Sequence, residues 1–269
     1  MFVFNAKIYY NIYGDVMANK IKNLIKDATL GIAYSQYELG LCFYKGKDVK
    51  QDYNRAFYWF KKASCDNFEA MYHLGICYKN GLGTTKNGKK ALQCFLDAAN
   101  NGVILAQYNV ATIYYLGEFI QKDYKKAFEW FLKAAEGGLV EAQYNVATCY
   151  SDGLGVRKDN AKAFYWYQET CKKKYAMGQY SLGRCYEFGL GIPQFDEMAF
   201  FWYQRSAHQG YEEAMYSLAM CYHNGYGVEK DENRAGIWLE RACKKNHQKS
   251  IEEKVHYRKN LFGKYKRVN

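Results

Sequence analysis

The chain has 269 residues with a formal net charge of +11, 18% aromatic residues, 23 glycines and a single proline. This composition excludes a low-complexity or disordered chain. The longest apolar runs fall far short of the roughly 20 residues that cross a bilayer, so an integral membrane protein is excluded as well. The opening segment, MFVFNAKIYYNIYGD, has neither a basic start nor a sustained apolar stretch, so we expect no secretory signal and a cytoplasmic protein.

The first predicted element is a helix over Val16 to Leu30, and a repeat that fills most of the chain follows it. One tyrosine marks each repeat, and successive markers are 35 or 36 residues apart: Tyr37, Tyr72, Tyr108, Tyr144, Tyr180 and Tyr216. Tryptophan recurs at a second register in every unit except the second, which has Cys94 there. A period of this length indicates stacked supersecondary units.

Each unit predicts two helices joined by a tight turn. In the fourth unit the apolar spacing of Tyr144, Ala147 and Tyr150 is helical, and the helix stops at Gly153, which can adopt a left-handed backbone. Asp159 stands where a side-chain oxygen can cap the second helix. The same position holds Asp52, Asn87, Asp123 and Asp231, whereas the fifth unit has Phe195 there, with Asp196 beside it.

Such a hairpin cannot bury its apolar faces alone, so the units are expected to stack. Small residues at one register of the first helix would let the paired helices approach closely, while the aromatic rings fill the space between hairpins. That register holds Gly40, Gly75, Ala111, Ala147, Gly183 and Ala219. Most aromatic residues are therefore expected in the core rather than at a ligand.

The repeated unit, A-x-Y-x-L-G-x-C-Y-x-x-G-x-G-V-x-x-D-x-x-K-A, closely resembles the Sel-1-like repeat, a relative of the tetratricopeptide repeat. The loop Gly153-Leu154-Gly155-Val156 matches it, whereas the first and third loops, Gly46 to Val49 and Gly117 to Ile120, lack the second glycine. The resemblance implies an all-α fold: a right-handed α-solenoid, or α/α superhelix, of six helix hairpins with N- and C-terminal capping helices.

The same resemblance divides the chain into three parts. It implies a capping segment at 1–32, a repeat array, and a basic capping helix and tail at 246–269, where Ile251 to Phe262 is predicted to form the last helix. The repeats are expected at about 33–69, 70–105, 106–141, 142–177, 178–213 and 214–245.

Members of that family act mostly as adaptors, so the resemblance implies a non-enzymatic scaffold that binds a protein or peptide, with no cofactor. A secreted, cysteine-rich branch is reported to bind β-lactams weakly, which leaves β-lactam binding or hydrolase activity as an alternative. That branch pairs cysteines eight residues apart, but the residues eight after Cys171 and Cys243 are Gln179 and Ile251. The nine cysteines are therefore expected to be free thiols.

Two motifs resemble chemical sites but lack the required groups. The stretch Gly83 to Lys90 nearly spells a phosphate-binding loop, yet Lys90 replaces the hydroxyl residue that binds magnesium and no strand precedes it. His73 and Cys77 lie four apart on one helix, but no further ligand follows at a consistent spacing, so no metal site is expected. No nucleophile, base and orienting group can be assembled from spacing, so no catalytic residue is expected.

Binding is expected on the first helices, which line the concave surface in solenoids of helix hairpins. Two of their registers, three residues apart, share one helix face and turn polar. We hypothesise that these registers form a groove that hydrogen-bonds an extended peptide or a partner helix: Glu38, His73, Asn109, Thr112, Asn145, Thr148, Ser181 and Arg184. The alternative is a solvated inner surface without a ligand.

Most of the positive charge lies at the C-terminal end. From Lys244 to Asn269, nine basic residues oppose Glu252 and Glu253, which gives +7 and leaves +4 for the other 243 residues. This segment is either a solvated cap or a weak tether to an anionic membrane, RNA or an acidic protein through screened electrostatics. No nucleic-acid-binding module is recognised, so nucleic acid is not the expected partner.

Overall fold

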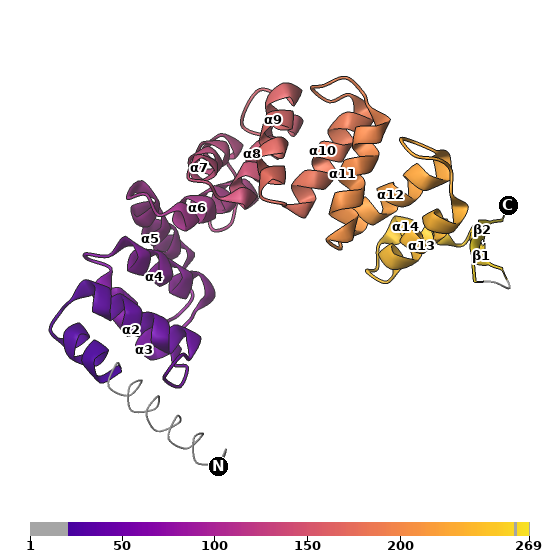
Figure 1. Ribbon diagram of the computed structural model, residues 1–269. Coiled ribbons are helices and arrows are strands. Elements are labelled where there is room, and N and C mark those ends of the chain that lie inside the picture. Colours follow the sequence, from indigo (N-terminus) through magenta and orange to yellow (C-terminus); the bar gives the residue numbers. More distant parts are fainter. Residues whose placement is uncertain (1–20, 261–262, 269) are drawn as a thin grey trace, which may run out of the picture. The chain divides into compact units, whose positions relative to one another are not determined.

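The computed structural model describes residues 21–260 and 263–268, and these residues form an all-α solenoid of six helix hairpins (Figure 1). The helices group into two compact units, Met1–Lys133 and Ala134–Asn269, and the boundary falls inside one helix. Each unit is a stack in which helices that follow one another in the chain pack together.

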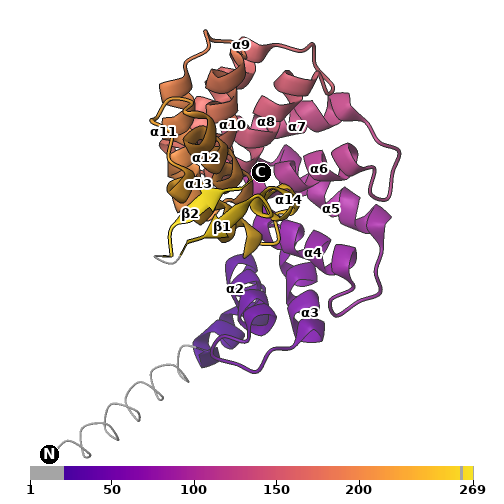
Figure 2. The ribbon, with the colours of Figure 1, turned by 90° about the vertical axis from the view of Figure 1, so that its right-hand side faces the viewer.

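In the first unit, residues 21–29 form a helical segment ahead of the hairpins. The predicted helix over Val16 to Leu30 is thus confirmed over that segment, and residues 16–20 lie outside the described part. Figure 2 shows α3 and α5 along one side of the unit and α2 and α4 along the other. The helices are α2 (Ala33–Lys45), α3 (Tyr53–Ala63), α4 (Phe68–Asn80), α5 (Gly88–Asn100), α6 (Ile104–Leu116) and α7 (Tyr124–Glu136), whose end belongs to the second unit.

The second unit continues the hairpin pattern and ends in a short helix and a two-stranded ribbon. Its elements are α8 (Val140–Asp152), α9 (Asn160–Lys172), α10 (Ala176–Phe188), α11 (Asp196–His208), α12 (Glu212–Asn224), α13 (Glu232–Cys243), α14 (Gln248–Lys254), β1 (Tyr257–Lys259) and β2 (Tyr265–Arg267). The two strands pair antiparallel, with Arg258 opposite Lys266.

The predicted helix caps are confirmed. At five second helices a side-chain oxygen accepts a hydrogen bond from the backbone N–H three residues later, over 2.8–3.0 Å: Asp52, Asn87, Asp123, Asp159 and Asp231. Phe195 precedes α11 without a side-chain cap, and Asp196 lies in the first turn instead. These contacts satisfy amide groups that the helix itself leaves unpaired, and they define where each second helix begins.

The register of small residues is also confirmed, because glycine there lets a ring lie directly on the helix backbone. A Cβ added to Gly40, Gly75 or Gly183 would lie 2.7 Å from a ring carbon of the paired second helix. The three rings are Phe60, Phe95 and Tyr203, which are at most 1% exposed.

At one contact between neighbouring repeats, a larger residue on one helix is matched by a smaller residue on the next. Three repeats hold alanine both near the end of the second helix and at the facing register of the next first helix, as in Ala98 and Ala106. Here α9 carries the fully buried Thr170, and α10 carries Gly178. A Cβ on Gly178 would lie 2.7 Å from the Thr170 Cβ and nearer still to its hydroxyl, so the glycine accommodates the larger threonine.

A second exchange lies in the loops that join the paired helices. The loop residue that is Gly83 in one repeat and Gly191 in another is left-handed in every repeat, and Phe119 adopts φ +67° there despite its side chain. A Cβ on Gly191 would lie 2.5 Å from the Asn160 carbonyl carbon, at the start of the preceding second helix. In the repeat whose loop carries Phe119, the preceding second helix, α5, starts with Gly88. The Phe119 ring occupies the space that a side chain at position 88 would need.

The predicted final helix over Ile251 to Phe262 is confirmed only for Ile251 to Lys254; strand β1 follows, and residues 261–262 lie outside the described part. The helix α14 begins earlier, where the His247 ring nitrogen accepts from the Ser250 N–H, and it ends at Lys254. Tyr257 and Tyr265 then alternate with exposed charged residues, and both rings are buried in the core cluster of α12 and α13. Alternation of apolar and charged residues favours strands, and Gly263, with φ +72°, turns the chain between them.

Candidate functional site

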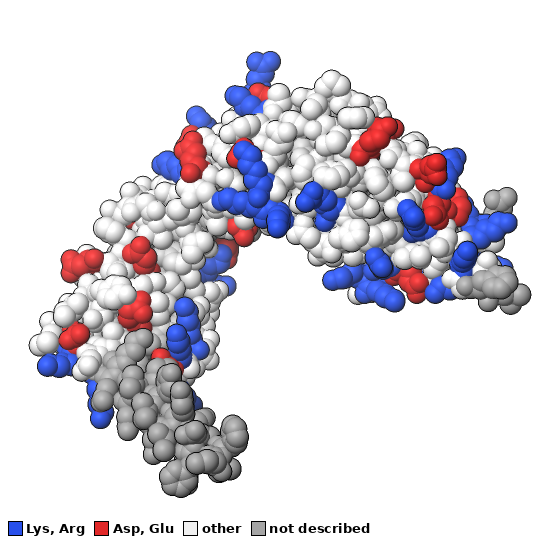
Figure 3. Space-filling model, in the orientation of Figure 1, with Lys and Arg blue, Asp and Glu red and all other residues white. Residues whose placement is uncertain are grey.

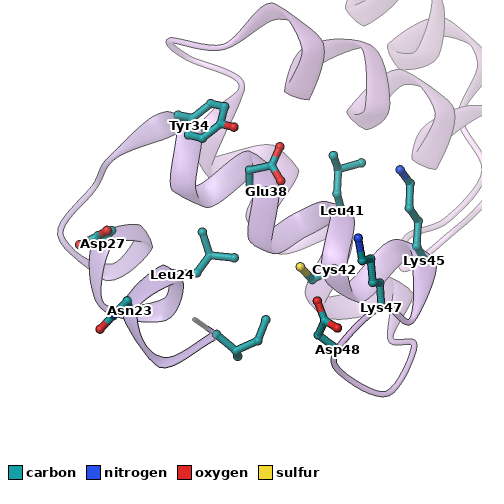
Figure 4. Close-up of a pocket in the computed structure, with 11 residues that line it drawn as sticks. Asn23, Leu24, Asp27, Tyr34, Glu38, Leu41, Cys42, Lys45, Lys47 and Asp48 are labelled. Atoms are coloured by element: carbon teal, nitrogen blue, oxygen red, sulfur yellow. The ribbon is translucent and has the colours of Figure 1, made fainter. Parts of the chain in front are cut away.

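The first-helix residues that the sequence singled out meet different surroundings in the two units. Glu38 lines a cavity of about 410 Å³ in the first unit, between residues 21–29, α2 and the loop after it (Figure 4). Lys45, Lys47 and Asp48 lie around the same cavity, so its rim carries both signs of charge. Ile21, the first described residue, also lines it.

His73 packs in an aromatic cluster rather than on an open surface. Its ring centroid lies 5.0–6.0 Å from four aromatic rings: Tyr37, Tyr44, Phe60 and Tyr72. Its Nδ1 is 2.9 Å from the Glu69 carbonyl oxygen. Burial lowers the pKa of His73, because the enclosed ring is easier to keep neutral than charged.

Asn109 and Thr112 lie on α6 and bond to their own helix. The Asn109 amide donates to the Leu105 carbonyl at 2.8 Å, and the Thr112 hydroxyl donates to the Tyr108 carbonyl at 2.9 Å. Asn109 also hydrogen-bonds the Tyr72 hydroxyl, which partly offsets the burial that raises the pKa of Tyr72. Sequence analysis missed this use of the tyrosine, which joins one repeat to the next.

In the second unit, Asn145 and Thr148 lie on α8 and Ser181 lies on α10. The Thr148 hydroxyl donates to the Tyr144 carbonyl at 3.1 Å. Burial raises the pKa of Tyr167 to about 12, while hydrogen bonds with Thr148 and Ser181 act in the opposite direction. Thr148 and Ser181 thus converge on one buried tyrosine hydroxyl, and Asn145 remains partly exposed on the same face.

Arg184 lies in a groove of about 610 Å³ on this face of the second unit. We call it the α10–α14 groove, because α10, α12 and α14 each contribute to its lining: Tyr180, Arg184, Glu187, Phe188, Glu213, Tyr216, Ser217, His247, Gln248 and Lys249. The Arg184 side chain is exposed, and its guanidinium lies 5.6 Å from the centroid of the Phe188 ring. The groove therefore offers a cation, an open aromatic ring and hydroxyl groups together.

Two further cavities share lining residues with this groove. One of about 230 Å³ shares Arg184 and contains Ser181, and the other, of about 430 Å³, shares Glu187 and Phe188. Phe188 is 56% exposed although it is the last residue of a helix. At this register the fourth unit has Asp152 and the sixth has Asn224. The aromatic residue at a position that is polar in these units was the sequence signal that could have pointed to Phe188.

Comparison with known proteins agrees with this architecture. A family model for the Sel1 repeat matches six successive segments, at 33–68, 68–103, 104–139, 140–175, 176–211 and 212–247. The chain belongs to the Sel1 repeat family. Sel1 repeats are in general protein-interaction modules, and the fold alone assigns no partner or site.

Solved Sel1 structures resemble the chain over most of its length. The c5321 protective antigen of uropathogenic Escherichia coli, which displays an SLR fold, superposes with a TM-score of 0.84 at 28% identity, over 89% of this chain and 52% of the antigen. A Sel1 repeat protein from Oxalobacter formigenes superposes with a TM-score of 0.74 at 27% identity, over 88% of this chain and 69% of that protein.

Curated relatives share only part of their length with this Sel1 protein. DAP3-binding cell death enhancer 1 of Rattus norvegicus is 31% identical over 91 residues, which are 34% of this chain and 18% of the relative. Protein SHC1 of Saccharomyces cerevisiae is 32% identical over 98 residues, which are 36% of this chain and 19% of the relative. The matched part is thus less than a fifth of either relative.

The described residues of this Sel1 protein contain neither a cluster of metal ligands nor a membrane-spanning helix. No three His, Cys, Asp or Glu side chains gather there as a metal site would require. None of the helices in 21–260 and 263–268 has the length and apolar character of a membrane span.

The basic C-terminal segment is partly folded onto the second unit. Lys259 lies 3.3 Å from Glu240, and Arg267 lies 3.2 Å from Glu253, so two of its charges are used within the fold. Arg258 and Lys266 remain exposed on the ribbon. Figure 3 shows Lys and Arg side chains gathered over this C-terminal end, with acidic side chains among them.

The cysteines lead to a testable prediction about thiol reactivity. None of the nine forms a disulfide, and burial raises the pKa of Cys77 and Cys149 to about 12. The thiolate is the nucleophile, so at pH 8 these two buried cysteines should stay protonated and react slowly with an aromatic disulfide reagent. Cys65 is exposed and should react fast, and Cys65→Ser should remove that fast phase.

Denaturing the unreduced protein should release all nine thiols to the same reagent. Fewer than about seven reactive thiols would show that disulfides form, contrary to the expectation for a protein of a reducing compartment.

Proposed function

We propose that this Sel1 protein is a non-enzymatic adaptor, located in the cytoplasm, that binds a peptide segment of a partner protein in the α10–α14 groove. The observation that carries the proposal is the groove itself, about 610 Å³ in volume, on the first helices of the fifth and sixth repeats. Of the residues predicted from sequence, Arg184 lies in it and Ser181 lines the adjoining cavity. Grooves of this size with a few polar groups suit an extended peptide.

The polar groups of the groove support this proposal. The Glu213 carboxylate lines the groove and hydrogen-bonds the Tyr211 hydroxyl, while its Oε2 atom is buried without a partner in the described part of the chain. This carboxylate gives the groove an acceptor that suits a peptide N–H. Ser217 and Tyr180 share a hydrogen bond at the same surface, and the Lys249 side chain is exposed beside them.

The groove predicts a charge-reversal result. Arg184→Glu should abolish capture of partner proteins in affinity purification followed by mass spectrometry, because it reverses the exposed charge of the groove. Since the side chain is exposed, the melting temperature should stay within about 2 °C of the parent value.

A matched control is available on a second helix. Arg205 is also exposed and also stacks on an aromatic ring, at 5.1 Å from Phe201, but it lies on α11 outside the groove. Arg205→Glu should retain the captured proteins. If both variants capture the same proteins as the parent, the groove is not the binding surface.

A further inference from the structure

The cavity of about 430 Å³ beside the groove has a composition of its own. It lies at the end of α10, the start of α11 and the end of α12. Two carboxylates line it, Glu187 and Asp196, together with the buried Tyr203 and Cys221. Two aromatic side chains, Phe188 and Tyr226, complete the lining and are 56% and 50% exposed.

Neither carboxylate is neutralised by a cation in the described part of the chain, since none of its ion pairs includes Glu187 or Asp196. Glu187 accepts from the Tyr203 hydroxyl, and Asp196 accepts from the Gln194 amide at 3.2 Å. Both carboxylates act on the same thiol: burial first, then Glu187 and Asp196, raise the pKa of Cys221 to about 12. The two carboxylates therefore lie around one cavity.

Nearby cations do not line this cavity. Arg184, one turn before Glu187, lies over the Phe188 ring on the groove side. Lys230 packs against Gly225, with its Cγ 2.9 Å from the place of a Cβ there. Glu197 is exposed on α11 and Glu229 is exposed in the loop between α12 and α13, and both add to the negative field around the cavity.

Other repeats of the chain show whether the fold itself requires carboxylates at the positions of Glu187 and Asp196. One repeat earlier, the equivalent cavity has Ser151 and Asn160 at the two carboxylate registers, and Leu190 in place of Tyr226. In the second repeat, Lys79 and Gly88 hold the carboxylate registers. The hairpin thus folds without acid at these positions, and the combination of two carboxylates with two open rings belongs to the junction of the fifth and sixth repeats.

We propose that this cavity is a subsite for one lysine or arginine side chain of the peptide held in the α10–α14 groove. This inference rests on the proposed function, because Glu187 and Phe188 line both spaces and would connect the peptide backbone to the subsite. The rings of Phe188 and Tyr226 pack along the aliphatic part of the side chain and face its charge. The carboxylates of Glu187 and Asp196 then pair with the ammonium or guanidinium group.

A small probe tests the subsite without a peptide. N-acetyl-lysine N-methylamide, titrated into the full chain and followed by NMR, should shift the signals of Phe188, Tyr226 and the α11 start. N-acetyl-norleucine N-methylamide, which lacks the charge, should bind at least about fivefold more weakly. Equal binding of the two probes, or shifts elsewhere only, would overturn the subsite.

Variants identify the carboxylates. Glu187→Gln with Asp196→Asn keeps acceptor atoms for Tyr203 and Gln194 but removes both charges, so it should abolish the preference for the lysine probe. Glu197→Gln, an exposed neighbour on α11 outside the cavity, should keep it. A retained preference in the double variant, with an unchanged melting temperature, would assign the charge recognition to other residues.

Peptide selection then distinguishes failure of the subsite from failure of the groove. Peptides selected from a random phage-displayed library should share one lysine or arginine, and its replacement by norleucine should cost about tenfold in affinity. Peptides that need Arg184 but no basic residue would leave the groove in place and overturn the subsite. If the lysine probe binds while no peptide depends on Arg184, the groove proposal fails and the cavity does not serve a groove-bound peptide.

Discussion

We expect Gly178→Ala to lower the free energy of unfolding by about 2 to 3 kcal/mol, which is near the upper end for overpacking a core. The added Cβ would lie 2.7 Å from the Thr170 Cβ and closer to its hydroxyl. Thr170 is fully buried, and its hydroxyl donates to the Tyr167 carbonyl at 2.7 Å, so it cannot turn away freely. Urea denaturation followed by circular dichroism measures the change.

The matched rescue is Thr170→Ala. Alone it should cost about 1 kcal/mol, because it leaves a space beside the glycine. Combined with Gly178→Ala it restores the alanine pair that other repeats hold, as at Ala63 and Ala70, so the double variant should be as stable as the parent or more so. If the double variant is as unstable as the sum of the two single changes, the residues do not compensate each other.

Gly88→Ala is expected to lower the free energy of unfolding by about 2 kcal/mol for a related reason. The new Cβ would lie 2.8 Å from the Phe119 Cβ and nearer to its ring. Phe119 is held at φ +67°, a conformation that bulky residues rarely adopt, so the loop has little freedom to move its ring aside. The same urea titration reports the change.

A double-mutant cycle with Phe119→Gly tests this contact. In the Phe119→Gly background, Gly88→Ala should cost nothing or stabilise the protein, since alanine favours helix and no ring opposes it. The coupling energy between the two changes should therefore be about 2 to 3 kcal/mol. An equal effect of Gly88→Ala in both backgrounds would show that the Phe119 ring does not restrict the side chain at position 88.

The pairs Thr170–Gly178 and Gly88–Phe119 show which part of the fold the sequence could predict and which part it could not. The hairpins and the small-residue register repeat six times and the capping residue five times, so their signal accumulates. Thr170, Gly178, Gly88 and Phe119 each deviate once from that pattern. A single deviation resembles random variation until the structure shows that two deviations touch.

The C-terminal end illustrates a different limit. Ile251 to Phe262 was predicted as a helix because a capping helix was expected to follow the last repeat. Tyr257 and Tyr265 instead pack against α13, where Gly236 leaves room for the Tyr265 ring. The strand pairing joins residues that a local pattern does not relate, such as Arg258 and Lys266.

The candidate site was only partly predictable for a related reason. Sequence periodicity placed Arg184 on the first-helix face, and it lies in the groove. Periodicity could not show that the hydroxyls of Thr112 and Thr148 bond to their own helices, nor that four rings enclose His73. Hydrogen-bond partners depend on side-chain conformations, which register alone does not specify.

The matched pair Thr170 and Gly178 also limits how the number of repeats can change in the gene. Residues 140–175 form one matched repeat, and its end separates Thr170 from Gly178. Duplicating that segment would set a copy of Thr170 against Ala142, whereas deleting it would set Gly178 against Ala134 and leave a void. Unequal recombination at repeat boundaries, the simplest route to a longer or shorter array, would therefore destabilise the fold at this junction.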